Sequence, residues 1–138
     1  MANMIRGISD NGGVVFYGVD STNIVAEAER IHKTSAVTSA ALGRLLTAAS
    51  MMGITLKSEQ DSLTLRLNGG GPAGTVLAVA DGAGCVKGYV QNPVVELPLR
   101  ADGKLDVGVK RPRRAAGERA GITVVSSLAS PPQEGSQL

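Results

Sequence analysis

Hydrophobic and polar positions follow two different periods along this chain, and the period changes near Gly53. Over residues 35–52, apolar residues recur at intervals of three and four, which is typical of one face of a helix. Over residues 63–67, leucine alternates with polar residues, the two-residue period of a half-buried strand. The pattern therefore predicts a helix followed by strands. The apolar positions of the helical stretch are Val37, Ala41, Leu45, Ala48 and Ala49.

Two further elements are predicted before that helix. Residues 13–19 are rich in β-branched and aromatic side chains and follow a turn-forming Asp-Asn-Gly stretch, which indicates an early strand. Residues 20–23 offer several side-chain oxygens suited to capping a helix N-terminus. We therefore expect a first helix over residues 22–33, separated from the second by Thr34 and Ser35.

The strand at 63–67 is predicted to belong to a three-stranded antiparallel meander. Residues 75–80 and 85–90 have strand-like composition, and short turns rich in glycine separate the three segments. Short links favour antiparallel neighbours. Residues 93–98 lie between two prolines and suit an edge or a loop. The fold class expected is α+β, a twisted, mainly antiparallel sheet with two helices packed on it and incomplete at its C-terminal end.

Residues 109–138 differ in character from residues 1–108. The first 108 residues carry nine basic and ten acidic side chains, whereas the last 30 carry five basic and two acidic, so the net charge of +2 originates in this predicted tail. The tail opens with a basic cluster at 110–114 and ends in a segment rich in Ser and Pro. We expect one domain over 1–108 and a disordered tail in which only residues 122–125 look able to form a strand.

Composition excludes several classes of protein. Hydrophobic residues make up 43% and charged residues 19%, as in a soluble globular protein. No stretch approaches the roughly 20 apolar residues of a membrane span, and the N-terminus has no secretory pattern. The one cysteine cannot build a disulfide framework, so a reducing, cytoplasmic location is expected.

Few side chains suggest chemistry. The glycine-rich turn at 68–74 lacks the Gly-Lys-Ser/Thr that opens a helix in phosphate-binding loops, so it is interpreted as a structural turn. One His and one Cys cannot supply a zinc site. His32 and Ser35 are favoured as structural residues at the helix junction, although a small enzyme using Ser35, His32 or Cys85 stays an alternative.

Three other features have simple interpretations. Cys85 at a strand start is expected to be buried and inert, with weak support for reactivity from Lys87. Met51 and Met52 are expected in the core. The basic cluster at 110–114 could neutralise phosphates, but no aromatic residue lies near it for stacking, so nucleic acid is an unlikely partner. No catalytic, cofactor-binding or metal-binding residue is therefore assigned.

Four ordered strings resemble the signatures of the 33 kDa chaperonin family, also called heat-shock protein 33. The longest is the helical segment 31–53. The turn at 71–74 and the segments 86–93 and 103–108 resemble the next three signatures in the same order. The resemblance covers residues 1–108 and gives way at Val109.

The resemblance implies a cytoplasmic, ATP-independent holdase chaperone that binds unfolded client proteins and is not an enzyme. Family members are dimers whose C-terminal domain holds zinc through four cysteines, and oxidation of these cysteines activates client binding. Those cysteines have no counterpart here, so no zinc and no redox switch are expected. The break at Val109 is interpreted as the mark of a truncated or frame-shifted product. The alternatives to a chaperone are a non-functional fragment of that kind, or an interaction or nucleic-acid-binding protein acting through its basic tail.

Overall fold

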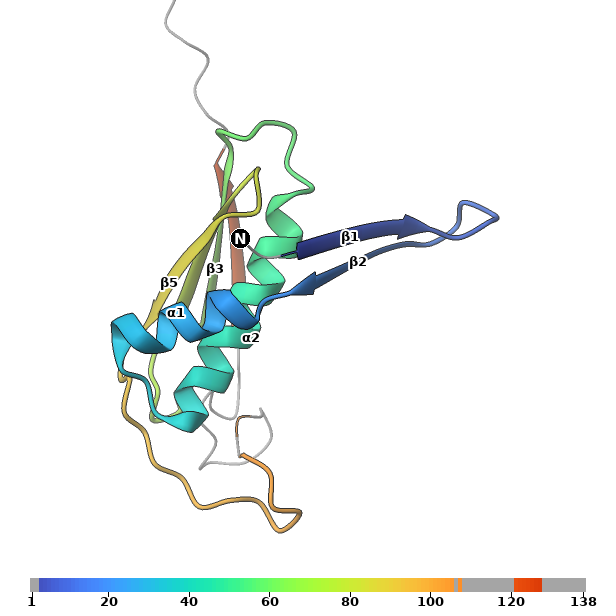
Figure 1. The fold of residues 1–138 in the computed structure, drawn as a ribbon. Helices are drawn as coiled ribbons and strands as arrows, with labels where there is room; N and C mark the ends of the chain where they lie inside the picture. The colour runs from blue at the N-terminus through green and yellow to red at the C-terminus, as the bar shows by residue number, and fades with distance from the viewer. Residues whose placement is uncertain (1–2, 106, 108–120, 128–138) are drawn as a thin grey trace, which may run out of the picture.

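A four-stranded antiparallel sheet with two helices on one face forms the body of the molecule, and a separate hairpin projects from it (Figure 1). The structure, a computed structural model, describes residues 3–105, 107 and 121–127. Its elements are β1 (Asn3–Ile8), β2 (Val15–Asp20), α1 (Thr22–His32), α2 (Ala36–Gly53), β3 (Ser62–Asn68), β4 (Val76–Asp81), β5 (Val86–Val90) and β6 (Gly121–Ser127).

The sheet has the strand order β5-β4-β3-β6, with every neighbouring pair antiparallel. The three strands β3, β4 and β5 form the meander expected from the alternating pattern and the short turns. Alternate residues face the helices, because side chains of a strand point to opposite sides in turn. The buried members of this face are Leu63, Leu65, Val76, Ala78, Ala80 and Val90.

Helix α2 supplies most of the other half of the core. Its apolar face packs chiefly on β4, and also on β3 and β5. Ten of its eighteen residues are buried, whereas none of the residues of α1 is. The largest fully buried side chain is Leu42 of α2. Helix α2 is therefore the one described helix that closes the core, and α1 lies outside it.

Helix α1 begins where the sequence predicts it. The carboxylate of Asp20 accepts hydrogen bonds from the Thr22 hydroxyl at 2.7 Å and the Thr22 backbone N–H at 3.1 Å. These bonds lower the pKa of Asp20, since they favour its charged form. The helix ends at Lys33, which has a left-handed conformation with φ of 52° and donates its N–H to the Glu29 carbonyl.

The N-terminal hairpin was only half predicted. Strand β2 matches the predicted early strand, but β1 was missed because its sequence, with Arg6 and Gly7 inside it, lacks a clear alternation. The two strands pair along their whole length and form a sheet of their own.

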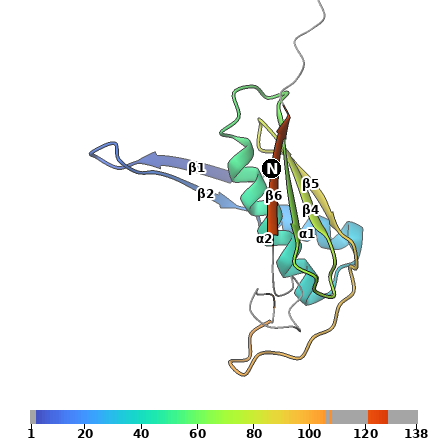
Figure 2. The same cartoon turned by 180° about the vertical axis from the view of Figure 1, so that it is seen from behind.

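Strand β6 corrects the expectation that residues 109–138 form a disordered tail outside the domain. It pairs with the full length of β3, from Gly121 opposite Asn68 to Ser127 opposite Ser62. Figure 2 shows it at the edge of the sheet opposite β5. Its β-branched residues, which suit a strand, made 122–125 the exception in the predicted tail. Residues 109–120 and 128–138 of that tail lie outside the described residues.

We expect Gly53→Ala to lower the free energy of unfolding by about 1–3 kcal/mol, as overpacking does. A Cβ at Gly53 would overlap the Asp81 carbonyl oxygen, a backbone atom that cannot turn aside. Gly13→Ala is the control, because its Cβ would meet only the exposed Asn11 side chain, at 3.2 Å or more. Urea denaturation measures both, and equal losses would contradict this interpretation.

Candidate functional site

A groove of about 510 Å³ lies between α1, α2 and the beginning of β5, and we call it the α1–β5 groove. Helix α1 contributes one wall, while α2 and Ile54 after it form the base. The turn before β5 and the first half of that strand form the other wall. Its apolar side chains are Met4 from β1, Ile24, Ala28 and Ile31 from α1, Leu46 from α2, Ile54, Ala83 from the turn, and Val86 from β5.

The groove exists because α1 packs on α2 along one side only. A Cβ at Gly43 of α2 would meet side-chain carbons of Val25 of α1, so the missing side chain lets the two helices approach closely there. On the other side of α1, Ile24 and Ala28 are only partly buried against the core, and Ile31 lies beyond them toward the end of the helix. Ile31 is 56% exposed as a result.

An open strand edge runs beside the groove. Asp81 donates its N–H to the Cys85 carbonyl at 3.0 Å, and Gln91 donates to Thr75 at 2.8 Å, which fixes the residues of β5 that bond to β4. The alternating pattern of an antiparallel pair then turns the N–H and C=O of Val86, Gly88 and Val90 away from β4. Among the described strands none lies on that side of β5.

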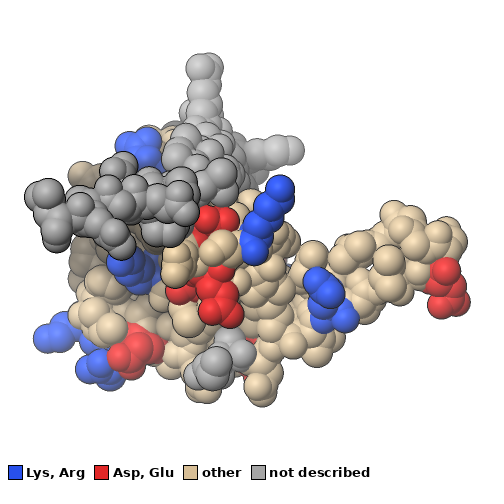
Figure 3. Space-filling view, turned by 90° about the horizontal axis from the view of Figure 1, so that it is seen from above, with Lys and Arg blue, Asp and Glu red and all other residues tan. Residues whose placement is uncertain are grey.

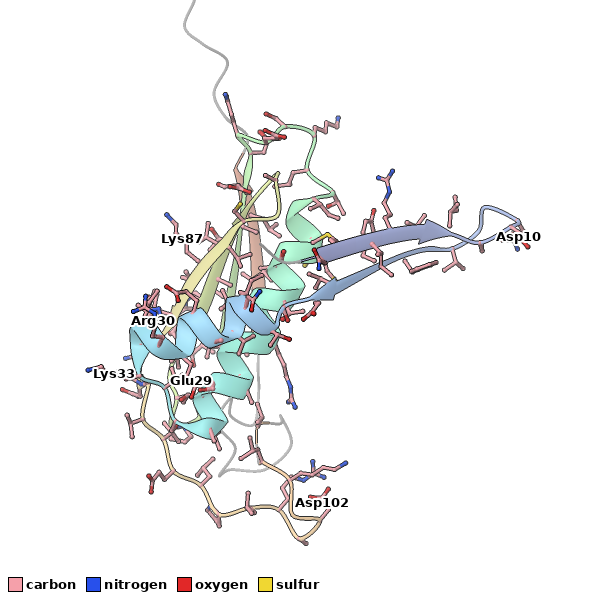
Figure 4. The ribbon with its side chains drawn as sticks, viewed as in Figure 1. Asp10, Glu29, Arg30, Lys33, Lys87 and Asp102 are labelled. Carbon is pink, nitrogen blue, oxygen red and sulfur yellow. The ribbon has the colours of Figure 1, made fainter. Side chains whose placement is uncertain are left out.

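Charged and polar side chains border the groove on α1. Arg30 donates to the Glu27 carboxylate at 2.6 and 2.9 Å, and this hydrogen bonding lowers the pKa of Glu27. Both side chains are mostly exposed, so the pair stabilises the helix only slightly. Figure 4 shows Arg30 near the end of α1 and Lys87 on β5. An apolar floor with a polar border is typical of a surface that binds other molecules.

Ser35 has the structural role that the sequence favours. Its hydroxyl accepts the Val95 N–H at 3.0 Å and lies 2.7 Å from the Val95 carbonyl oxygen, to which it donates. Thr38 donates its own hydroxyl hydrogen to the Pro93 carbonyl. These bonds attach the segment after β5, which forms an irregular loop as expected for residues 93–98, to the start of α2. Ser35 does not line the α1–β5 groove.

His32 and Cys85, two of the three residues named for the alternative of a small enzyme, line the same groove. His32 is the last residue of α1, at the helix junction as expected. Cys85 is exposed, so the expectation that it is buried is wrong. It lies in the turn before β5, where its N–H bonds to the Asp81 carboxylate at 3.0 Å and its side chain reaches solvent.

Two further expectations from the sequence concern the glycine-rich segment at 68–74 and the pair Met51 and Met52. Within residues 68–74, Gly70 donates to the Asn68 side chain and Gly74 to the Gly71 carbonyl, so the segment is a structural turn. Met52 is 39% exposed, and Met51 is half-buried in a shallow surface hollow. The expectation that this pair belongs to the core is therefore wrong, because both lie near the end of α2, off its sheet-facing side.

The residues present do not fit a zinc centre. Across the described ranges, no three His, Cys, Asp or Glu side chains are grouped so that they could hold a metal. The whole sequence has one Cys and one His, whereas the family resemblance implies four cysteine ligands. In the same part of the chain, no helix is long and apolar enough to cross a membrane.

The fold and the groove define a small α+β domain with an apolar binding surface bordered by an open strand edge. Comparison with known proteins assigns the chain to a family within that class. The model of the family described as Hsp33 protein matches residues 2–136. The chain belongs to the Hsp33 family.

Individual relatives agree with this assignment. The chain is 46% identical over 127 residues to the 33 kDa chaperonin of Alkaliphilus metalliredigens, covering 92% of this chain and 42% of that protein. It is 45% identical to that of Clostridium tetani, covering 91% and 41%. The crystal structure of the 33 kDa chaperonin from Thermotoga maritima superimposes with a TM-score of 0.75 at 30% identity, covering 91% of this chain and 45% of that one.

These matches correct the boundary drawn at Val109. The family model extends to residue 136, so the segment expected to match nothing in the family belongs to the match. The chain spans about two fifths of the length of the curated relatives that it matches.

We expect Ser35→Ala to cost about 1–3 kcal/mol of unfolding free energy, because the part-buried Val95 N–H would lose its acceptor. Ser58→Ala is the control, since the Ser58 hydroxyl makes only an exposed bond to Gln60, and its effect should stay within about 0.5 kcal/mol. Urea denaturation of both variants measures the two losses of unfolding free energy. A Ser35→Ala variant as stable as the wild type would show that the loop is attached by other contacts.

Proposed function

We propose that this protein is a holdase chaperone that binds apolar segments of unfolded proteins in the α1–β5 groove. The observation that carries the proposal is the groove itself, in which Ile24, Ala28, Ile31 and Val86 lie beside the open edge of β5. An unfolded chain offers apolar side chains and unpaired backbone groups together, whereas a folded protein offers few of either. The groove is complementary to both.

The binding mode follows from this pairing of features. An extended client segment can add to β5 through the outward N–H and C=O groups of Val86, Gly88 and Val90, as strand addition does elsewhere. Backbone hydrogen bonds form with a client segment of any sequence. The apolar side chains of α1 add affinity for hydrophobic client side chains. Such a site accepts many clients and needs no chemical step, so the protein acts in this proposal by binding and not as an enzyme.

The names of the relatives support the same function, since those compared are called 33 kDa chaperonins. A chain with one unpaired cysteine needs no oxidising compartment, and we place it in the cytoplasm. Clients are expected to be proteins that unfold under stress and would otherwise aggregate. Nucleic acid is not an expected partner, because no aromatic residue lies near the basic cluster at 110–114 to stack on bases.

We expect Ile31→Glu to weaken client binding about tenfold, since a charge at an apolar contact costs at least about 1.4 kcal/mol when it loses water. Ile31 is 56% exposed, so its replacement should leave the fold intact. Val94→Glu is the matched control, because Val94 is 66% exposed and does not line the groove. Light scattering of a thermally unfolding client, with the chaperone titrated, measures the effect.

Two results would count against the groove. If both glutamate variants suppress aggregation as well as the wild type, clients bind elsewhere. If both lose suppression equally, the effect is a general response to added charge. Circular dichroism of each variant, recorded at the assay temperature, shows whether the fold survives the substitution.

We also propose that client binding is constitutive and independent of redox state, and that the chain holds no zinc. The chain has one cysteine, so it cannot form the disulfides of a four-cysteine switch. Suppression of aggregation should be equal in dithiothreitol and in peroxide, and Cys85→Ser should behave like the wild type in both. Elemental analysis of the purified protein should find no stoichiometric zinc. A strong gain of suppression in peroxide that Cys85→Ser abolishes would contradict this proposal.

A further inference from the structure

The chain contains the same tripeptide, Asn-Gly-Gly, in two different settings. One copy begins at Asn11 in the turn between β1 and β2, and the other begins at Asn68, the last residue of β3. Glycine after asparagine has no side chain to hinder attack of its backbone nitrogen on the asparagine carboxamide, which is the first step of deamidation. Because the two copies share this local chemistry, a difference in their reactivity must originate in the fold.

Each asparagine side chain folds back in the same way on its own tripeptide. The Asn11 Oδ1 atom accepts the Gly13 N–H at 3.0 Å, and the Asn68 Oδ1 atom accepts the Gly70 N–H at 3.0 Å. This is the turn that asparagine side chains form with the backbone two residues on. The two settings differ in what else contacts the carboxamides.

The fold holds the Asn68 carboxamide in place. Its Nδ2 atom, which would have to leave in deamidation, donates to the Thr75 hydroxyl at 3.0 Å. The Asn68 backbone pairs with Gly121 of β6, and the residue is half-buried. Reaction at Asn68 therefore requires local opening of the end of β3.

The Asn11 carboxamide is less restrained and has an additional activating contact. No hydrogen bond to a described residue holds its Nδ2 atom, while the Ser9 hydroxyl donates to its Oδ1 atom at 2.7 Å, beside the Gly13 N–H. Two donors on one carbonyl oxygen stabilise the negative charge that develops there when a nucleophile attacks the carbon, as in an oxyanion hole. Asn11 and Gly12 are both exposed, and no atom hinders approach at the position of a Gly12 Cβ.

One bond in this turn opposes the reaction. The Gly12 nitrogen, which is the attacking atom, donates its hydrogen to the Ser9 carbonyl at 2.8 Å, and this bond has to open before the nitrogen can attack. Figure 3 shows the turn as the far end of an arm that stands clear of the body, and Figure 4 labels Asp10 on it. At the tip of a two-stranded hairpin such an opening costs little free energy.

We infer that Asn11 is a site of spontaneous deamidation, selected by the fold over Asn68 and promoted by the Ser9 hydroxyl. The Gly12 nitrogen gives its proton to water and forms a bond to Cγ of Asn11, and the electron pair of the C=O bond moves to Oδ1. The C=O bond then re-forms as the Cγ–Nδ2 bond breaks, and the nitrogen takes up a proton and leaves as ammonia. Water opens the resulting cyclic imide to aspartate or isoaspartate, so one water is consumed and one ammonia is released.

The products change the tip of the hairpin. Either product adds a negative charge next to Asp10, and isoaspartate also lengthens the backbone of the turn by one carbon. The longer turn no longer fits the bonds between Ser9 and Val14 that close the hairpin. No residue of this turn lines the α1–β5 groove, and the inference goes beyond the proposed function without depending on it.

Peptide mapping by mass spectrometry of the full chain, incubated at mildly alkaline pH, is the first measurement. We expect Asn11 to deamidate at least about tenfold faster than Asn68 in the folded protein, because only Asn68 needs local opening of β3. In urea the two rates should become similar, since the tripeptides are the same. Equal rates in the folded protein, or a faster reaction at Asn68, would overturn the inference.

Two variants of Ser9 then test the role of its hydroxyl. Ser9→Ala should slow the reaction at Asn11 in the folded protein by roughly two- to tenfold, the rate effect of one hydrogen bond, whereas Ser9→Thr keeps the hydroxyl and should react like the wild type. Each rate is divided by the rate of the same variant in urea, so that only the effect of the fold is compared. A Ser9→Ala variant that reacts as fast as the wild type, or faster, would overturn the role assigned to the hydroxyl.

Discussion

The packing of α2 on the sheet is the contact on which the rest of the molecule depends. Leu42, Leu46 and Ala49 are almost completely buried against β4 and its neighbours, and no other described helix contributes to this core. One helix is narrower than a sheet of four strands. The contact therefore covers β4 and its two neighbours, β3 and β5, and α1 packs on α2 and partly on β5.

The position of α1 follows from the limited area of the sheet that α2 can cover. It is attached through Val25 at Gly43 and through its connections to β2 and α2, and it buries no residue completely. Ile24 and Ala28 pack partly against the core and also form a wall of the α1–β5 groove. The hairpin of β1 and β2 forms a sheet separate from the one that α2 covers. The core is small, and apolar side chains are therefore left exposed in the α1–β5 groove and on the β1–β2 hairpin.

Sequence reasoning succeeded where a local pattern decides structure. The spacing of apolar residues predicted α2, alternation predicted β3, and Asp20 indicated the start of α1. Sequence reasoning failed for strands whose formation depends on pairing with a strand distant in the sequence. Strand β1 is defined by pairing with β2, and β6 by pairing with β3, more than fifty residues earlier. The groove was not predicted, because it combines Ile31, Leu46 and Val86, which come from three elements. No spacing in the sequence indicates that these residues meet.

The central claim is that unfolded chains bind along the open edge of β5. Amide hydrogen exchange of the protein, alone and with a thermally unfolding client bound, tests it directly. We expect the N–H groups of Val86, Gly88 and Val90 to become protected in the complex, since they would bond to the added strand. Protection should also rise in α1. A complex that forms while exchange at these three amides and in α1 is unchanged would contradict the claim.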